Sequence, residues 1–172
     1  IADNDINGLK NNGVNIKTEE MGLAFENVTK AVLRRLGMNV SDDLRKEINT
    51  KTNRTDIIID LGDSNIIIVE CKSSRKDYSK FSSVTRQLKA YVNHCEKHGY
   101  KVKGAILISG SFTDDFIQEC KTFYEFNVTL IDAQTFINIY EEFKQSKLKG
   151  FPVTLFRHGL IQEEIISKAL KK

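Results

Sequence analysis

Two β-branched runs joined by a short polar turn constrain this chain more than any other feature. The runs lie within residues 54–72, and the Leu-Gly-Asp-Ser-Asn segment between them is typical of a hairpin turn. If the strands pair symmetrically about Asp63, Asp56 lies opposite Glu70, and the period-2 alternation of a strand places Lys72 on the same face as Glu70. The hairpin therefore brings two carboxylates and an ammonium together.

Facing carboxylates need a physical reason, because like charges directly opposite each other destabilise a sheet. A bound divalent cation is the common reason, since carboxylate oxygens are good ligands for it. Asp60 is less suited to this role, because in the same register it pairs with Ile66 beside the turn, far along the strand from Lys72. A slip of one residue would move Glu70 and Lys72 to the other face, so the interpretation depends on the register.

Length and composition predict one globular domain. The chain has 172 residues, is 40% hydrophobic and contains one proline, which is enough for a sizeable core. Residues 1–18 are polar and rich in Asn, without a sustained apolar period, so we expect a linker or flexible N-terminal segment followed by a folded domain over 19–172. A start at Ile1 rather than Met suggests a domain excised from a larger protein.

Several protein classes have little support in the sequence. No apolar run has the length of a membrane span and no signal peptide is visible, so we expect no membrane association and an intracellular location. The three cysteines are odd in number and form no C-x-x-C pair, which favours small buried hydrophobes over disulfides or a zinc ribbon. A net charge of +3 suits a polyanionic partner only if the cations cluster.

Apolar spacing predicts a helix over residues 19–36, ended by Gly37. Glu26 lies beside the apolar stripe of this helix, where two interpretations are open. It can face inward toward the hairpin, which the acids of the hairpin favour, or pair with Lys30 on the surface at i,i+4. The polar segment 41–53 is predicted to be a loop or a short strand.

A second helix is predicted from Phe81 to Cys95. Gln87 and Tyr91 lie four residues apart on it, so their polar groups can reach the end of the hairpin, although Tyr91 can equally be a core residue. Basic residues before and along this helix can bind phosphates or form an ordinary solvated face. They are Arg75, Lys76, Lys80, Arg86 and Lys89.

The rest of the chain alternates strands and helices. Strands are predicted over 102–109 and 128–131, and helices begin at Thr113, at Asp132 and near residue 162. This alternation predicts an α/β fold with a central mixed sheet flanked by helices, in which the hairpin supplies the antiparallel strands. His94 and His98 have a spacing that zinc can use, but no fourth ligand is evident.

The order Glu26, Asp56 and Glu70-Cys71-Lys72 resembles the PD-(D/E)xK nuclease superfamily, with Thr55 where that pattern often has proline. Segments 70–92, 106–112 and 159–164 also resemble the FokI-type cleavage domain of type IIS restriction endonucleases. The pair Gln87 and Tyr91 is similar to the Q-x-x-x-Y motif of RecB-like nucleases. The resemblance covers most of the chain after residue 20 and implies a restriction-endonuclease-like fold.

This resemblance implies magnesium-dependent hydrolysis of DNA phosphodiesters, with Mn²⁺ as a substitute. Asp56, Glu70 and the backbone carbonyl of Cys71 would hold the metal, which suits a hard cation. Lys72 would orient the attacking water or stabilise the negative charge that develops on phosphorus. Glu26 would complete a second metal site or position Lys72, while Gln87 and Tyr91 would be auxiliary.

The resemblance also implies partners. The substrate would be double-stranded DNA, with sequence recognition supplied by a separate domain or subunit of a restriction-modification system in the prokaryotic cytoplasm. FokI-type domains pair through an acidic and a basic residue on the helix after the E-x-K strand, where this chain has Arg86 and Ala90. We therefore expect a weak or DNA-induced dimer that nicks more readily than it breaks both strands.

Two alternatives stay open. A RecB-like repair or processing nuclease would use the same chemistry with a preference for free ends. A non-catalytic DNA-binding or assembly module with a nuclease fold is the other, although the intact set of Asp56, Glu70 and Lys72 speaks against it.

Overall fold

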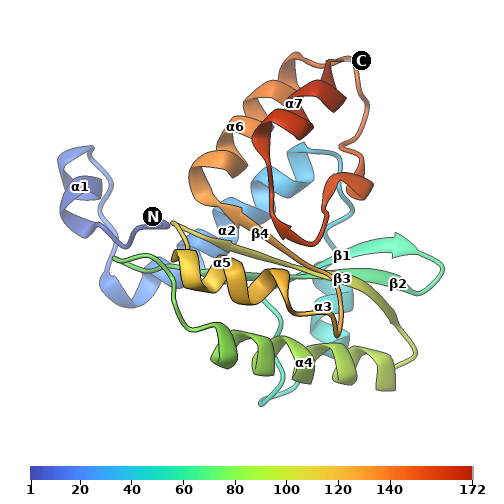
Figure 1. The fold of residues 1–172 in the computed structure, drawn as a ribbon. Helices are drawn as coiled ribbons and strands as arrows, with labels where there is room; N and C mark the ends of the chain where they lie inside the picture. Colours follow the sequence, from blue (N-terminus) through green and yellow to red (C-terminus); the bar gives the residue numbers. More distant parts are fainter. Residues whose placement is uncertain (172) are drawn as a thin grey trace.

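The computed structural model describes residues 1–171 and consists of a mixed β-sheet between two layers of helices (Figure 1). Within this range the sheet has the strand order β1-β2-β3-β4-β5, with β1 antiparallel to β2 and the other neighbours parallel. The strands are β1 Ile57–Gly62, β2 Asn65–Lys72, β3 Lys101–Ser109, β4 Val128–Asp132 and β5 Gly159–Leu160. The helices are α1 Ile6–Asn11, α2 Met21–Arg35, α3 Asp42–Ile48, α4 Phe81–Lys97, α5 Asp114–Lys121, α6 Ala133–Gln145 and α7 Glu163–Leu170, with 3₁₀ turns at Thr18–Glu20 and Val153–Leu155.

Each face of the sheet has its own apolar core. Helices α2, α6 and α7 cover one face, and α3, α4 and α5 cover the other (Figure 1). Successive residues of β1 alternate between the layers, so Ile57 and Ile59 join the first core and Ile58 the second. The predicted α/β class and central mixed sheet are confirmed. Across residues 1–171, no helix is long and apolar enough to span a bilayer.

The hairpin has the register that the sequence predicts. Ile57 pairs with Val69 and Asp60 with Ile66, so pairs are symmetric about residue 63 and the next position places Asp56 opposite Glu70. The register shifts only beyond Asp60, at a bulge beside the turn. Asp63 and Ser64 form the turn itself with φ values of 50° and 60°, the left-handed conformation that a two-residue hairpin loop requires.

Most predicted elements are confirmed, but the interpretation of residues 41–53 as a loop or strand is wrong. This segment contains α3, which begins where the Ser41 hydroxyl accepts a hydrogen bond from Leu44 N–H at 3.1 Å. Asp42 and Asp43 follow in the first turn, where negative charge stabilises a helix. Only Leu44 and Ile48, four residues apart, face the core from α3, and this apolar pair is too short to predict a helix from spacing alone.

The first residues of the chain contact the body of the domain. The carbonyl of Ile1 accepts a hydrogen bond from the Ser73 hydroxyl at 3.1 Å, and that of Ala2 accepts one from Ser74 N–H at 3.0 Å. A short helix, α1, follows these residues. The division into residues 1–18 and 19–172 stays a prediction.

Two of the three thiols are buried, as the sequence predicts. All three cysteines are free, with Cys95 and Cys120 buried and Cys71 half-buried. Burial raises the pKa of Cys95 and Cys120 to about 11, so both stay neutral at physiological pH.

Candidate active site

Asp56 immediately precedes β1, and Glu70 lies near the end of β2. Asp56 is half-buried, and its Oδ2 accepts a hydrogen bond from Cys71 N–H at 2.8 Å. Glu70 is only 3% exposed and lies on the face of β2 that α4 covers, two residues beyond Ile68. The hairpin register thus places two acids together where they are largely shielded from solvent.

The two carboxylate oxygens of Glu70 have different surroundings. Oε1 accepts hydrogen bonds from Lys72 Nζ at 2.6 Å and from Gln87 Nε2 at 3.0 Å. Oε2 is shielded from solvent and has no hydrogen-bond partner among residues 1–171. A buried oxygen without a donor is costly and needs an explanation, and a bound cation is one.

Lys72 is held from two sides. Besides Glu70, its ammonium donates to Gln87 Oε1 at 3.0 Å. Because an ammonium can only donate, the amide oxygen of Gln87 faces it and the amide NH₂ is left for Glu70 and for the Tyr91 hydroxyl at 2.6 Å. Gln87 and Tyr91 therefore support the E-x-K strand, and Tyr91 also packs its ring in the core below α4.

Burial dominates the titration of the acids. It raises the pKa of Asp56 to about 8, with the charges of Glu70 and Glu26 acting in the same direction and the Cys71 N–H bond opposing them. Burial also raises the pKa of Glu70, although Lys72 counteracts it. The fold therefore resists ionising both carboxylates unless a positive charge joins them.

Lys72 stays an ammonium. Burial alone would lower its pKa, but the charge of Glu70 and the hydrogen bond to it outweigh burial and raise the pKa overall. The site thus combines a lysine that stays positively charged with two acids whose pKa values burial raises.

Glu26 approaches from α2, on the other side of the sheet. It is half-buried, and its negative charge raises the pKa of Asp56, Glu70 and Cys71. Lys30 pairs with Asp42 at 3.2 Å rather than with Glu26, so the surface-pair interpretation does not describe this structure. Within the part of the chain that the structure describes, no three Asp, Glu, His or Cys side chains are close enough to bind one ion. The charge of Glu26 acts on both acids, and its role in binding a metal or in positioning Lys72 stays a prediction.

The predicted DNA-binding cations are exposed along α4 and the segment before it, at Arg75, Lys76, Lys80, Arg86 and Lys89. Lys89 pairs with Glu125 at 2.5 Å, and Arg75 Nε donates to the carbonyl of Asn4 at 3.4 Å. Both residues thus have partners within the protein.

The two histidines with zinc-like spacing have structural contacts. His94 Nε2 lies 2.7 Å from the carbonyl of Ile48, and His98 Nδ1 lies 2.9 Å from the carbonyl of His94. The His94 contact joins α4 to the end of α3, and the His98 contact lies within α4 and its cap. Both histidines therefore have structural roles that need no metal.

Sequence patterns missed two contributors to the site. Asn49 clamps Thr55, the residue before Asp56: its Oδ1 accepts from Thr55 N–H at 3.0 Å and from the Thr55 hydroxyl at 3.2 Å, and its Nδ2 donates to the Thr55 carbonyl at 3.0 Å. Tyr78 lies near enough to the site for its charges to act on the hydroxyl: burial raises the Tyr78 pKa, Lys72 opposes this and Glu70 adds to it. An Asn at the end of a polar segment was the only sequence signal for the clamp.

A mixed sheet whose hairpin sets an acid opposite an E-x-K strand, with helices on both faces, defines a nuclease domain of the PD-(D/E)xK class. The family model "FokI, cleavage domain" matches residues 11–163, and the chain belongs to this family of type IIS nuclease domains. Comparison with curated proteins and with solved structures gave no significant match. The family resemblance seen in the sequence is confirmed.

Proposed function

We propose that this domain is a Mg²⁺-dependent DNA endonuclease, the cleavage module of a type IIS-like restriction enzyme. The observation that carries the proposal is Glu70 Oε2, a buried carboxylate oxygen without a donor within the described chain, in the same site as Asp56. Mg²⁺ takes oxygen ligands and keeps several waters, which suits a site with two carboxylates, and Mn²⁺ is expected to substitute.

Three groups would hold the cation: Asp56, Glu70 Oε2 and the backbone carbonyl of Cys71. The N–H and C=O of one strand residue point to the same side, and Cys71 N–H points to Asp56, so its carbonyl faces that side too. When bound, the cation neutralises charge and lowers the pKa of a coordinated water. The donor set fits such an ion because every member is a hard oxygen.

Lys72 is the residue that acts on the reacting phosphate. Its ammonium has three N–H donors, and the bonds to Glu70 and Gln87 use two of them. The third is available for an attacking water or for the oxygen on which negative charge develops. Gln87 and Tyr91 fix the position of this ammonium, and Glu26 would complete a second metal site or help to position Lys72.

The partners follow from the same proposal. The substrate is double-stranded DNA, bound in part by the cations along α4, and a separate domain or subunit supplies sequence recognition. Arg86 and Ala90 are exposed one turn apart on α4 and cannot form a reciprocal ion pair with a second copy. Dimers therefore form weakly or only on DNA, in the prokaryotic cytoplasm that restriction-modification implies.

Nicking of a supercoiled plasmid tests the function. We expect relaxation with Mg²⁺ or Mn²⁺, none with EDTA, and loss of activity in Glu70→Gln. Asp60→Asn, which changes an acid of the same hairpin outside the site, is the matched control and keeps most of the activity. Relaxation in EDTA without added metal would contradict the proposal.

A RecB-like processing nuclease is the second candidate, favoured by the 2.6 Å hydrogen bond between Gln87 and Tyr91 within the site. Circular and linear forms of one plasmid separate the two candidates, because an end-dependent enzyme leaves the circle intact. A non-catalytic module would cut neither form with any metal.

A further inference from the structure

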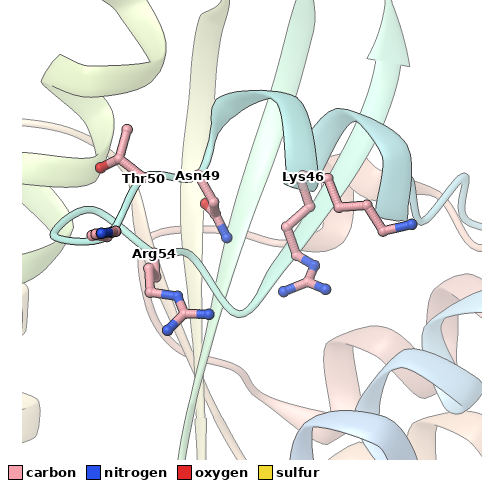
Figure 2. A pocket seen from close by; sticks show the side chains of 6 residues that line it. Lys46, Asn49, Thr50 and Arg54 are labelled. Carbon is pink, nitrogen blue, oxygen red and sulfur yellow. The ribbon is translucent and has the colours of Figure 1, made fainter.

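A basic hollow lies at α3 and the loop that follows it. Arg45, Lys46, Asn49, Thr50, Lys51 and Arg54 line this open hollow of about 700 Å³, which we call the α3 hollow (Figure 2). Of the lining residues that the structure describes, four are cations and none is an acid. Its four cations are distinct from the α4 cations and from the side chains of the acid site.

The charges of the hollow are poorly neutralised. Lys51 and Arg54 are exposed. Lys46 lies 3.7 Å from Asp43, but these side chains are 71% and 99% exposed, so water weakens the pair.

Arg45 is also short of a partner. Its Nε lies 3.6 Å from Asp42 and has no hydrogen-bond acceptor within residues 1–171. Asp42 already binds Arg34 at 2.6 Å and Lys30 at 3.2 Å. One carboxylate cannot neutralise three cations, so positive charge remains at the hollow.

The hollow is fixed next to the cleavage site. Arg54 precedes Asp56 by two residues, so their Cα atoms are at most about 7 Å apart. Asn49, which lines the hollow, is bonded three times to Thr55, and Figure 2 shows the Asn49 and Arg54 side chains on the same side of the loop. The three Asn49–Thr55 hydrogen bonds and this short stretch of chain therefore hold the hollow close to Asp56.

We infer that the α3 hollow binds the phosphodiester backbone of duplex DNA beside the bond being cut, as a second basic surface separate from α4. The inference rests on the proposed endonuclease function. Its chemistry is that of a polyanion site: guanidinium and ammonium groups line it, while Asn49 and Thr50 use their side chains within the loop. Contacts of this kind fix the register of a duplex without reading its sequence.

Salt-dependent binding of a short duplex tests the inference. The test variant is Lys46→Gln/Lys51→Gln/Arg54→Gln in the full chain, measured with Ca²⁺ to prevent cleavage. The control, Lys147→Gln/Lys149→Gln/Lys168→Gln, removes equal charge from exposed residues in α7 and in the connection after α6. The slope of log K against log salt should become less steep by about 2–3 in the test variant, because each phosphate contact contributes about 0.9, and affinity should fall at least about tenfold.

The outcomes separate the inference from the function on which it rests. Wild-type affinity and slope in the test variant, with wild-type protein still nicking plasmid, overturn the hollow and leave the endonuclease intact. Wild-type protein that neither binds nor nicks DNA overturns both. The conservative variant Lys46→Arg/Lys51→Arg/Arg54→Lys should bind like wild type, and matching thermal unfolding of all variants excludes a folding defect. A loss confined to single-stranded DNA, with duplex binding unchanged, would also refute the inference.

Discussion

Exchange of Asp56 for Asn should stabilise the metal-free domain as the pH rises, while it abolishes cleavage. Burial and the charge of Glu70 raise the pKa of Asp56 from 3.8 to about 8. The folded protein thus holds this proton more tightly than the unfolded chain does. The stability that Asp56 contributes is fully present below pH 4 and is lost as the pH rises through 8. Asn is neutral throughout, so it avoids this loss.

The magnitude follows from the two pKa values. A pKa difference of one unit corresponds to about 1.4 kcal/mol, so a rise from 3.8 to about 8 corresponds to about 6 kcal/mol between acid and alkaline conditions. Asn keeps a side-chain oxygen that can accept the Cys71 N–H bond, so the exchange removes charge and little else. A gain of this size is a large share of the ~5–15 kcal/mol that stabilises a typical domain.

Urea unfolding in EDTA across this pH range measures the effect. The free energies of unfolding of Asp56→Asn and wild type should coincide near pH 4 and diverge up to pH 8. Asp60→Asn is the control, because Asp60 lies on the same strand and bonds Gly62 N–H at 2.8 Å with an oxygen that Asn retains. Mg²⁺ should raise the stability of wild type and not that of Asp56→Asn. If the free energies of unfolding of wild type and Asp56→Asn changed in parallel with pH, the reasoning would be refuted.

The remaining predictions concern catalysis, metal, the clamp and assembly. Lys72→Ala should lower nicking at least about 100-fold with DNA affinity nearly unchanged, since one ammonium adds little to many phosphate contacts; retained nicking would refute its role. Ca²⁺ should bind, as calorimetry can show, without supporting cleavage, and full cleavage with Ca²⁺ would argue against the metal site. Asn49→Ala should cost about 1–3 kcal/mol of stability in urea unfolding and slow nicking; an unchanged midpoint would mean that the clamp is unimportant. Sedimentation without DNA should show a monomer, and a tight dimer at micromolar concentration would contradict the inference that Arg86 and Ala90 prevent stable pairing.

The hairpin and its acids could be predicted because two simple regularities determine them. Strand alternation has a fixed period, and a symmetric hairpin pairs residues equally far from its centre. The bulge lies between Asp60 and the turn, so it leaves the pairing of Ile57 with Val69 and the placement of Glu70 unchanged. Gln87 and Tyr91 could be placed for a similar reason, since residues four apart share one face of a helix.

The contacts around α3 could not be predicted, because side-chain choices rather than periodicity create them. Lys30 could pair with Glu26 or with Asp42, and sequence spacing does not reveal that Asp42 lies closer. The helix itself is stabilised by the Ser41 cap and contributes one fully buried residue, Ile48. Neither strand alternation nor helix spacing predicts the α3 hollow, because its cations come from a helix and from the loop that follows it.

Thr55 explains how this chain holds Asp56 without the proline that the superfamily pattern often has. A proline would restrict the backbone by about 0.4–1 kcal/mol of unfolded-state entropy but would remove the N–H of residue 55. Thr55 keeps that N–H and uses it, with its hydroxyl and carbonyl, in three hydrogen bonds to Asn49. At about 1 kcal/mol each, these bonds constrain the backbone at least as strongly as proline would. Unlike proline, these hydrogen bonds also join the end of α3 to the residue before Asp56. They therefore hold the α3 hollow and the acid pair in one arrangement.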